Sequence, residues 1–365
     1  MESFVNSLPN PNDIKENLKK IKNNEDTSIT QEKYLEYMYG KGNTDSLFYL
    51  GILYLYGCGV DKDYVKAKTC FEIAVGEGHT DSHWGLGEIY LYGYGVDQNY
   101  ETAREYFELA AVKGQSDKGV TASQHRLGEI YYFGHGVDQN YETALTYFKS
   151  AADKGLDVSQ HKLGMIYMYG YGVDQDYGTA LKYFKSAADE GKPESQHQLG
   201  IIYYFGHGVD KDYQTARKYF ELASDKGHTE SQHRLGVMYY FGRGVEQNYE
   251  IARNYFKIPS ISGFLESKYK LGEIYYFGHG IKQDYKKARE FFEFAANKEH
   301  TESKFRLGEM YYFGHGVKQD FEKARSFFQY GVEKGHSWSK TRLNELNRDM
   351  NEIISTSLLI CSLRK

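Results

Sequence analysis

Apolar side chains recur at helical spacing in neighbouring segments of the chain. In the segment TESQHRLGVMYYFG, Ser231, Leu235 and Met238 fall at positions i, i+4 and i+7, which places them on one face of a helix. Thr229 and Gln232 have the spacing of a capping box at its start. A Gly-Arg-Gly turn follows, and then NYEIARNYF carries a second apolar stripe. The pattern predicts two helices joined by a short turn that contains glycine.

The same pattern recurs with a period of 36 residues. A Leu-Gly dipeptide marks each copy, and positions are numbered from its glycine. Every copy has Ser at −5, Tyr at +3, Gly at +6 and +8, Ala at +16 and Phe at +20. One longer step contains an insertion, residues 116–120, which predicts a bulge between two repeats. The marker glycines are Gly51, Gly87, Gly128, Gly164, Gly200, Gly236, Gly272 and Gly308.

The repeat predicts an all-α fold. Neither helix of a pair can bury its apolar stripe alone, so each pair must stack on its neighbours. The small residues at −5, 0 and +16 let helix axes approach closely. We expect a right-handed α–α superhelix, a solenoid of tandem helix-turn-helix repeats of 36 residues. It spans residues 31–350 as a half unit, eight units and a terminal half unit. Residues 1–30 are expected to hold a short capping helix, and residues 351–365 form an apolar tail.

Composition changes this picture little. The 38 Gly and 36 Tyr belong mostly to the repeat, so they indicate fold rather than chemistry. A net charge of −5 and an aromatic content of 16% argue against a disordered chain and against nucleic acid as a partner. Three cysteines cannot form a disulfide scaffold, which favours an intracellular, cytoplasmic location. No apolar run is long enough to predict membrane insertion.

The consensus SxxxLGxxYxxGxGVxxDYxxAxxYF resembles the Sel-1-like repeat family, which is related to the tetratricopeptide repeats. The resemblance covers residues 31–350. It implies a scaffold or adaptor that assembles protein complexes, and not an enzyme. Family members usually carry Ala at −5, where this chain has Ser. Only Cys58 and Cys70 fall within the repeats, so the disulfides of the secreted branch are not expected.

Positions −6, −3, +1, +4 and +5 cluster on the side of the first helix that faces away from its Leu and Tyr core face. In tetratricopeptide-like stacks the matching positions line the concave groove, and aromatic residues are typical interface anchors. The sequence leaves a second interpretation open, in which the +4 and +5 aromatics pack between repeats. The predicted partner-binding residues are Trp84, His125, Glu129, Tyr132, His161, Met168, His197, Tyr204, His233, Tyr240, Glu273, Tyr276, Glu309 and Tyr312.

Two other functions compete with a protein or peptide partner. A hydrolase would use His125 and Glu129, which lie one helical turn apart. A carbohydrate-binding groove would use the tyrosines. Equivalent histidines of adjacent repeats are too far apart to share one metal ion, and the Gly-x-Gly turn lacks the third glycine of a dinucleotide site. We therefore expect no metal, no cofactor and no catalytic residues.

Overall fold

The computed structural model describes residues 31–114 and 116–363, which form 18 α-helices and no strand. The first helix of each repeat is called the A helix and the second the B helix. The A helices are α4 (Asp45–Tyr56), α6 (Ser82–Tyr92), α8 (Asp117–Phe133), α10 (Asp157–Tyr169), α12 (Pro193–Phe205), α14 (Thr229–Phe241), α16 (Leu265–Phe277), α18 (Thr301–Phe313) and α20 (Ser337–Leu363). The B helices are α3 (Gln31–Gly40), α5 (Tyr64–Gly76), α7 (Tyr100–Lys113), α9 (Tyr141–Asp153), α11 (Tyr177–Asp189), α13 (Tyr213–Asp225), α15 (Tyr249–Ile261), α17 (Tyr285–Ala296) and α19 (Phe321–Glu333).

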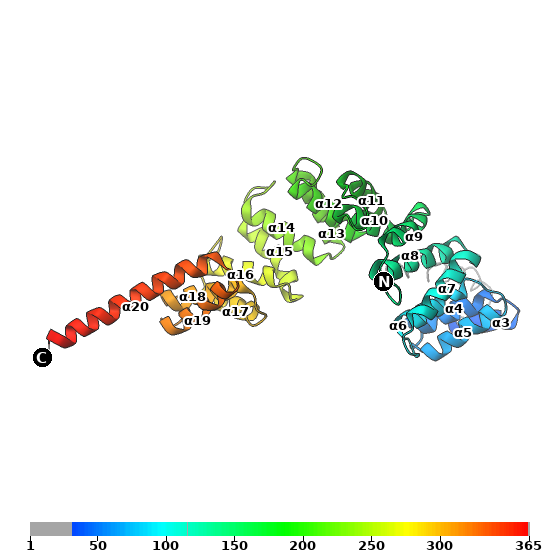
Figure 1. The fold of residues 1–365 in the computed structure, drawn as a ribbon, viewed down its shortest axis with the longest axis horizontal. Coiled ribbons are helices and arrows are strands. Elements are labelled where there is room, and N and C mark those ends of the chain that lie inside the picture. The colour runs from blue at the N-terminus through cyan, green and yellow to red at the C-terminus, as the bar shows by residue number, and fades with distance from the viewer. Residues whose placement is uncertain (1–30, 115, 364–365) are drawn as a thin grey trace. The chain divides into compact units, whose positions relative to one another are not determined.

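The chain divides into two compact units, Met1–Ser195 and Gln196–Lys365. Within each unit, consecutive helices pack side by side, so that α9 contacts both α8 and α10, and α15 contacts both α14 and α16 (Figure 1). The predicted all-helical solenoid is confirmed. None of the described helices is both long and apolar enough to cross a bilayer.

The turn between the helices of a repeat depends on its two glycines. Gly134 has a φ of 71° and ends α8 in the left-handed conformation. Gly136 also has a positive φ, and a Cβ there would lie 2.6 Å from the Cβ of Tyr100 in the preceding repeat. Asn140 then caps α9, because its side chain accepts a hydrogen bond from the N–H of Thr143 at 2.9 Å.

The core of each repeat lies between the Leu-Gly glycine and the B-helix phenylalanine. Phe148 and Ala144 are completely buried in the first unit. A Cβ on Gly128 would lie 2.6 Å from the ring of Phe148, closer than real side chains approach. All eight marker glycines face the +20 phenylalanine of their own repeat in this way. Glycine is therefore required at this position because the phenylalanine ring leaves no room for a side chain, and not because of the backbone conformation.

Two local expectations are wrong. The insertion forms no bulge, because residues 117–120 extend the start of α8 by about one turn and Ser116 caps it, accepting from the N–H of Gly119 at 3.0 Å. The capping box expected at Thr229 is replaced by His228, whose Nδ1 lies 3.2 Å from the N–H of Ser231. In both cases the residue just before the helix accepts a hydrogen bond from a backbone N–H of the first turn.

The two ends of the chain lie outside the regular repeats. The expected capping helix lies in residues 1–30, outside the described residues. At the other end, α20 runs without a break from the last half repeat through residue 350 to Leu363, so the apolar tail continues an A helix. Figure 1 shows α20 extending well beyond the ends of α18 and α19. Ile353 and Ile354, in this extension, are about half exposed.

Candidate functional site

The four histidines at −3 are bonded to serines of the next repeat, and all but the half-buried His161 are buried. In α8, His125 Nδ1 lies 2.9 Å from Ser159 Oγ in the next A helix. In the second unit, His197 and Ser231 form the same pair at 2.9 Å. The row is completed by His161 with Ser195 at 2.8 Å and by His233 with Ser267 at 2.8 Å. Each imidazole therefore joins two neighbouring repeats.

Burial disfavours the charged form of three of these histidines, His125, His197 and His233. It lowers the pKa of His197 to about 3 and that of His233 to about 4. Burial also lowers the pKa of His125. Only one ring nitrogen of a neutral imidazole carries a hydrogen. The serine hydroxyl can either donate to Nδ1 or accept from it, so it can pair with both tautomers. Among the described residues, no group of three His, Cys, Asp or Glu side chains could hold a metal ion.

The aromatic side chains expected to face a partner at +4 are mostly buried. Tyr204 is 3% exposed and Tyr276 is 5% exposed, and the Tyr276 hydroxyl lies 2.8 Å from Nδ1 of His315 in the next turn. Tyr132 is half-buried. Most of this row is therefore covered by the chain itself, because the rings contact the turn of the following repeat. The other buried members of the predicted set at −3 and +4 are Trp84, Met168, Tyr240 and Tyr312.

The glutamates at +1 belong to ion-pair ladders along the A helices. In the second unit, Glu273 accepts hydrogen bonds from Lys270 at 2.7 Å and from Arg306 at 2.8 Å. Arg306 also reaches Glu309 at 2.8 Å, and Arg342 reaches Glu309 from the next helix. Although burial favours the protonated form, these cations lower the pKa of Glu273. The glutamates therefore link repeats to one another.

The pair proposed for hydrolysis has the expected proximity, but the serine hydroxyl beside it is not accessible. Nε2 of His125 lies 3.6 Å from Oε1 of Glu129. Burial opposes ionisation of Glu129, but His125, Arg126 and Lys162 hold its pKa well below the usual range. Arg126 donates to Glu129 at 2.6 Å. A neutral imidazole beside an ionised carboxylate can act as a general base, but the hydroxyl that His125 contacts, that of Ser159, is completely buried.

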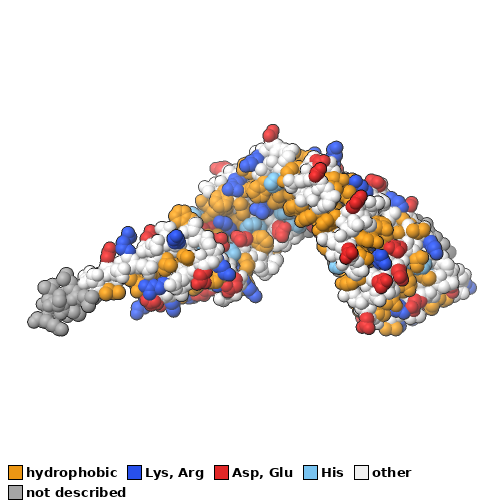
Figure 2. Space-filling view, viewed as in Figure 1, with side chains coloured by type: hydrophobic (Ala, Val, Ile, Leu, Met, Phe, Trp, Pro, Cys, Tyr) orange, Lys and Arg blue, Asp and Glu red, His pale blue; other side chains and the backbone are white. Residues whose placement is uncertain are grey.

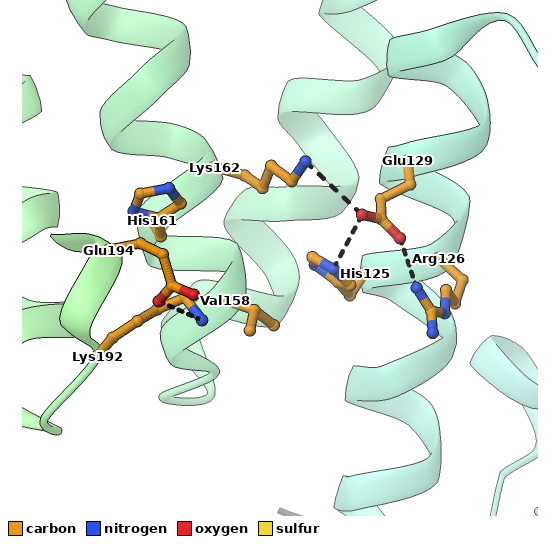
Figure 3. Close-up of a pocket in the computed structure, with 8 residues that line it drawn as sticks. All are labelled: His125, Arg126, Glu129, Val158, His161, Lys162, Lys192 and Glu194. Carbon is orange, nitrogen blue, oxygen red and sulfur yellow. Dashed lines mark hydrogen bonds and ion pairs between the residues drawn. The ribbon is translucent and has the colours of Figure 1, made fainter. Parts of the chain in front are cut away.

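A cleft of about 210 Å³ lies beside this pair in the first unit. Figure 3 shows Lys162 directed at Glu129, and Lys192 directed at Glu194. The two ion pairs measure 3.7 and 3.5 Å. The lining is therefore charged, with each lysine facing a carboxylate. The cleft is lined by His125, Arg126, Glu129, Val158, His161, Lys162, Lys192 and Glu194.

The exposed aromatic residues stand one position further along, at +5. Within each unit they form a row on the A helices together with cations at −2 of the following A helix, and this set is called the aromatic–cation row. Lys162 lies 5.0 Å from the ring centre of Phe133 in the first unit, and Arg306 lies 5.1 Å from that of Phe277 in the second. The exposed fractions are 36% for Tyr92, 49% for Phe133, 49% for Tyr169, 42% for Phe205, 48% for Phe241, 43% for Phe277 and 44% for Phe313.

Sequence reasoning placed +4 and +5 on the same side of the helix, chose the +4 side chains as partner-binding residues and left out those at +5, which are the exposed ones. A signal was present in the recurrent Lys or Arg at −2, as in Lys270 and Arg306. Long cationic side chains cover aromatic faces that remain partly in water. Figure 2 shows hydrophobic side chains interspersed with charges of both signs on the face that it draws.

Comparison with known proteins agrees with this repeat structure. The Sel1 repeat model matches the chain eight times, at residues 44–79, 80–114, 121–156, 157–192, 193–228, 229–258, 265–300 and 301–336. A search of curated proteins finds no match.

Two solved structures are similar over most of the chain. One is c5321, a protective antigen of uropathogenic Escherichia coli strains with an SLR fold. It has a TM-score of 0.77 and 29% identity, over 87% of this chain and 67% of that one. The other is a Sel1 repeat protein from Oxalobacter formigenes, with a TM-score of 0.62 and 25% identity, over 88% of this chain and 92% of that one. With eight matched repeats that coincide with its helix pairs, the chain belongs to the Sel1 repeat family.

Proposed function

We propose that this chain is a protein-binding scaffold whose partner contacts the aromatic–cation row. Sel1 repeats generally mediate protein–protein interactions and are generally non-enzymatic. The observation that carries the proposal is the exposure of an aromatic ring at +5 in seven of the eight repeats, while the neighbouring +4 side chain is buried in six of those seven. Exposed aromatic rings on rigid helices are the usual anchors of protein interfaces, because they bury large area at little cost in side-chain entropy.

The row suits an extended partner. In the second unit, Phe205, Phe241, Phe277 and Phe313 repeat on successive A helices, and each has a cation beside it on the next A helix. A stacked Lys or Arg keeps donors available to a partner while it shields one face of the ring. A partner that lies along the row can therefore combine apolar contact with hydrogen bonds at every repeat.

The chemistry of the other predicted residues favours a scaffold over the two alternatives. The −3 histidines and the +1 glutamates are engaged with neighbouring repeats. Most +4 tyrosines are too buried to stack on a sugar ring. Free thiols at Cys58 and Cys70 are consistent with the intracellular, cytoplasmic location that we also propose.

Affinity purification with quantitative mass spectrometry, from extracts of the source organism, tests the proposal. The test variant carries Phe205→Ala, Phe241→Ala and Phe277→Ala. The matched control carries alanine at three exposed B-helix residues of the same unit, Leu222, Ile258 and Phe294, which are 49%, 57% and 43% exposed.

We expect the partners of the unmodified chain to be lost from the test variant and kept by the control, while both retain native circular dichroism. Equal recovery by the two variants contradicts the proposal.

A further inference from the structure

One cation of the aromatic–cation row lacks the carboxylate that its counterparts have. Arg126, Lys162, Lys270, Arg306 and Arg342 each lie within 4 Å of a glutamate at +1. Arg234 in α14 has the same −2 position. In the described part of the chain, no carboxylate lies within ion-pair distance of it.

The reason is a change of sequence in two neighbouring repeats. The +1 positions that would face Arg234 are Ile201 in α12 and Val237 in α14, where the ladder elsewhere has glutamate. Glu230, one turn before Arg234, instead lies 3.7 Å from Nε2 of His197. The guanidinium of Arg234 lies 5.7 Å from the ring centre of Phe205. It is half-buried, so it is held in place without its charge being neutralised.

A second unpaired arginine lies nearby. Arg243 stands between the two turn glycines that follow α14, a position where other repeats have His, Tyr or Cys. It is exposed, donates to the Tyr204 hydroxyl and lies 5.1 Å from the ring centre of Phe241. Among the described residues, no carboxylate pairs with it either. Phe205 and Phe241, both more than 40% exposed, therefore carry one unneutralised guanidinium each.

Charge complementarity identifies the kind of partner that fits. A guanidinium held against an aromatic face presents a fork of N–H donors that matches a carboxylate. The rings beside it offer apolar contact, as do the half-buried Ile201 and Val237. A polyanion such as nucleic acid fits poorly, because the same unit carries the glutamates of the ladder and the chain has a net charge of −5.

We propose that the surface formed by Phe205, Arg234, Phe241 and Arg243 binds a peptide segment of a partner protein in which an Asp or Glu stands next to an aliphatic or aromatic residue. This inference rests on the proposed scaffold function and names the chemistry of its partner. The carboxylate pairs with Arg234, and the neighbouring apolar side chain packs against Phe205 and Phe241.

A library of random heptapeptides with acetylated and amidated ends, screened with the full chain, tests the inference. The strongest binder is then titrated by fluorescence anisotropy, alongside its analogue with Gln or Asn in place of the acid and a labelled oligo-dT. The protein variants are Arg234→Gln, Arg243→Gln, Phe277→Ala and the control Arg253→Gln, which lies on the B helix α15. Thermal unfolding checks that each variant is folded.

We expect an acid beside an apolar residue in the selected peptides. Arg234→Gln and the amide analogue should each weaken binding by about tenfold, and together by little more than either alone. Arg243→Gln should weaken it less, and Arg253→Gln should leave it within twofold. An absence of binders, selected peptides without acids, unchanged affinity in Arg234→Gln, or tighter binding of oligo-dT would each overturn the inference.

The Phe277→Ala variant separates this inference from the proposed function. If Phe277→Ala weakens binding and Arg234→Gln does not, the row binds peptides but the acidic specificity is wrong. If neither variant weakens the binding of the selected peptide, the row is not the binding surface and both proposals fail.

Discussion

His125 Nδ1 and Ser159 Oγ lie 2.9 Å apart, on A helices of consecutive repeats. The serine at this position replaces the alanine usual in the family that the sequence resembles. A buried imidazole loses its bonds to water, and this hydroxyl restores one of them. At Ser159 and the three equivalent serines that face a −3 histidine, this departure from the repeat consensus is explained by the histidine of the preceding repeat.

This pairing predicts that serines at the equivalent position of different repeats contribute differently to the free energy of unfolding. Ser159→Ala leaves the His125 nitrogen without a partner and should destabilise the chain by about 1–2 kcal/mol. Ser123→Ala is the matched control, since Ser123 is equally buried but follows a repeat with Trp84 at −3 and bonds only to the Gly119 carbonyl. Its loss should cost less than about 0.5 kcal/mol. Urea unfolding followed by circular dichroism measures both, and equal losses would show that the inter-repeat bond contributes nothing.

The buried histidines predict acid sensitivity. His197 and His233 have folded-state pKa values of about 3 and about 4, below the ordinary 6.5. Between these values and 6.5 the unfolded chain binds more protons, so stability falls as pH falls from 6.5 towards 4. Each histidine should contribute on the order of 2 kcal/mol to this loss. The double variant His197→Gln, His233→Gln should flatten the slope of unfolding free energy against pH, and a slope equal to that of the unmodified chain would contradict this reasoning.

The marker glycines should tolerate no side chain. Gly164→Ala places a Cβ 2.6 Å from the fully buried ring of Phe184 and should destabilise the fold by about 1–3 kcal/mol. Gly76 is a control at the end of α5, where a Cβ would meet nothing within 4 Å. Gly76→Ala should be neutral or stabilising by up to about 1 kcal/mol. Thermal melting of the two variants checks the contrast, and a similar melting temperature for both would refute it.

An ion pair of the buried ladder should contribute more to the free energy of unfolding than an exposed ion pair. Glu273→Gln removes the negative charge that neutralises Lys270 and Arg306 and should cost about 2–4 kcal/mol. Glu72→Gln breaks an exposed pair with Lys68 and should cost less than about 1 kcal/mol. Unfolding in low and high salt tests the difference, because only the exposed pair is strongly screened. A loss below 1 kcal/mol for Glu273→Gln would show that the ladder is not stabilising.

The sequence was sufficient for the fold but not for the exposed surface. Gly236 and Phe256 define the A and B helices and their contact, because their spacing repeats and each has a single packing role. The sequence favoured Tyr276 over Phe277 as the partner-binding side chain, but the two are only 100° apart on one helix, and it is Phe277 that is exposed. Which of them is buried depends on the rotation between successive repeats, which the pattern within one repeat does not specify. The burial of the His row depends on the same rotation.

The regular spacing of Phe205, Phe241, Phe277 and Phe313 has a consequence for how a partner aligns. Identical anchors at equal intervals allow a bound segment to slip by one repeat with little change in contact energy. A single position that differs in charge removes this degeneracy. Arg234, the cation without a glutamate, is such a position. Under the proposed function, it fixes the register in which a bound segment aligns with these otherwise equivalent repeats.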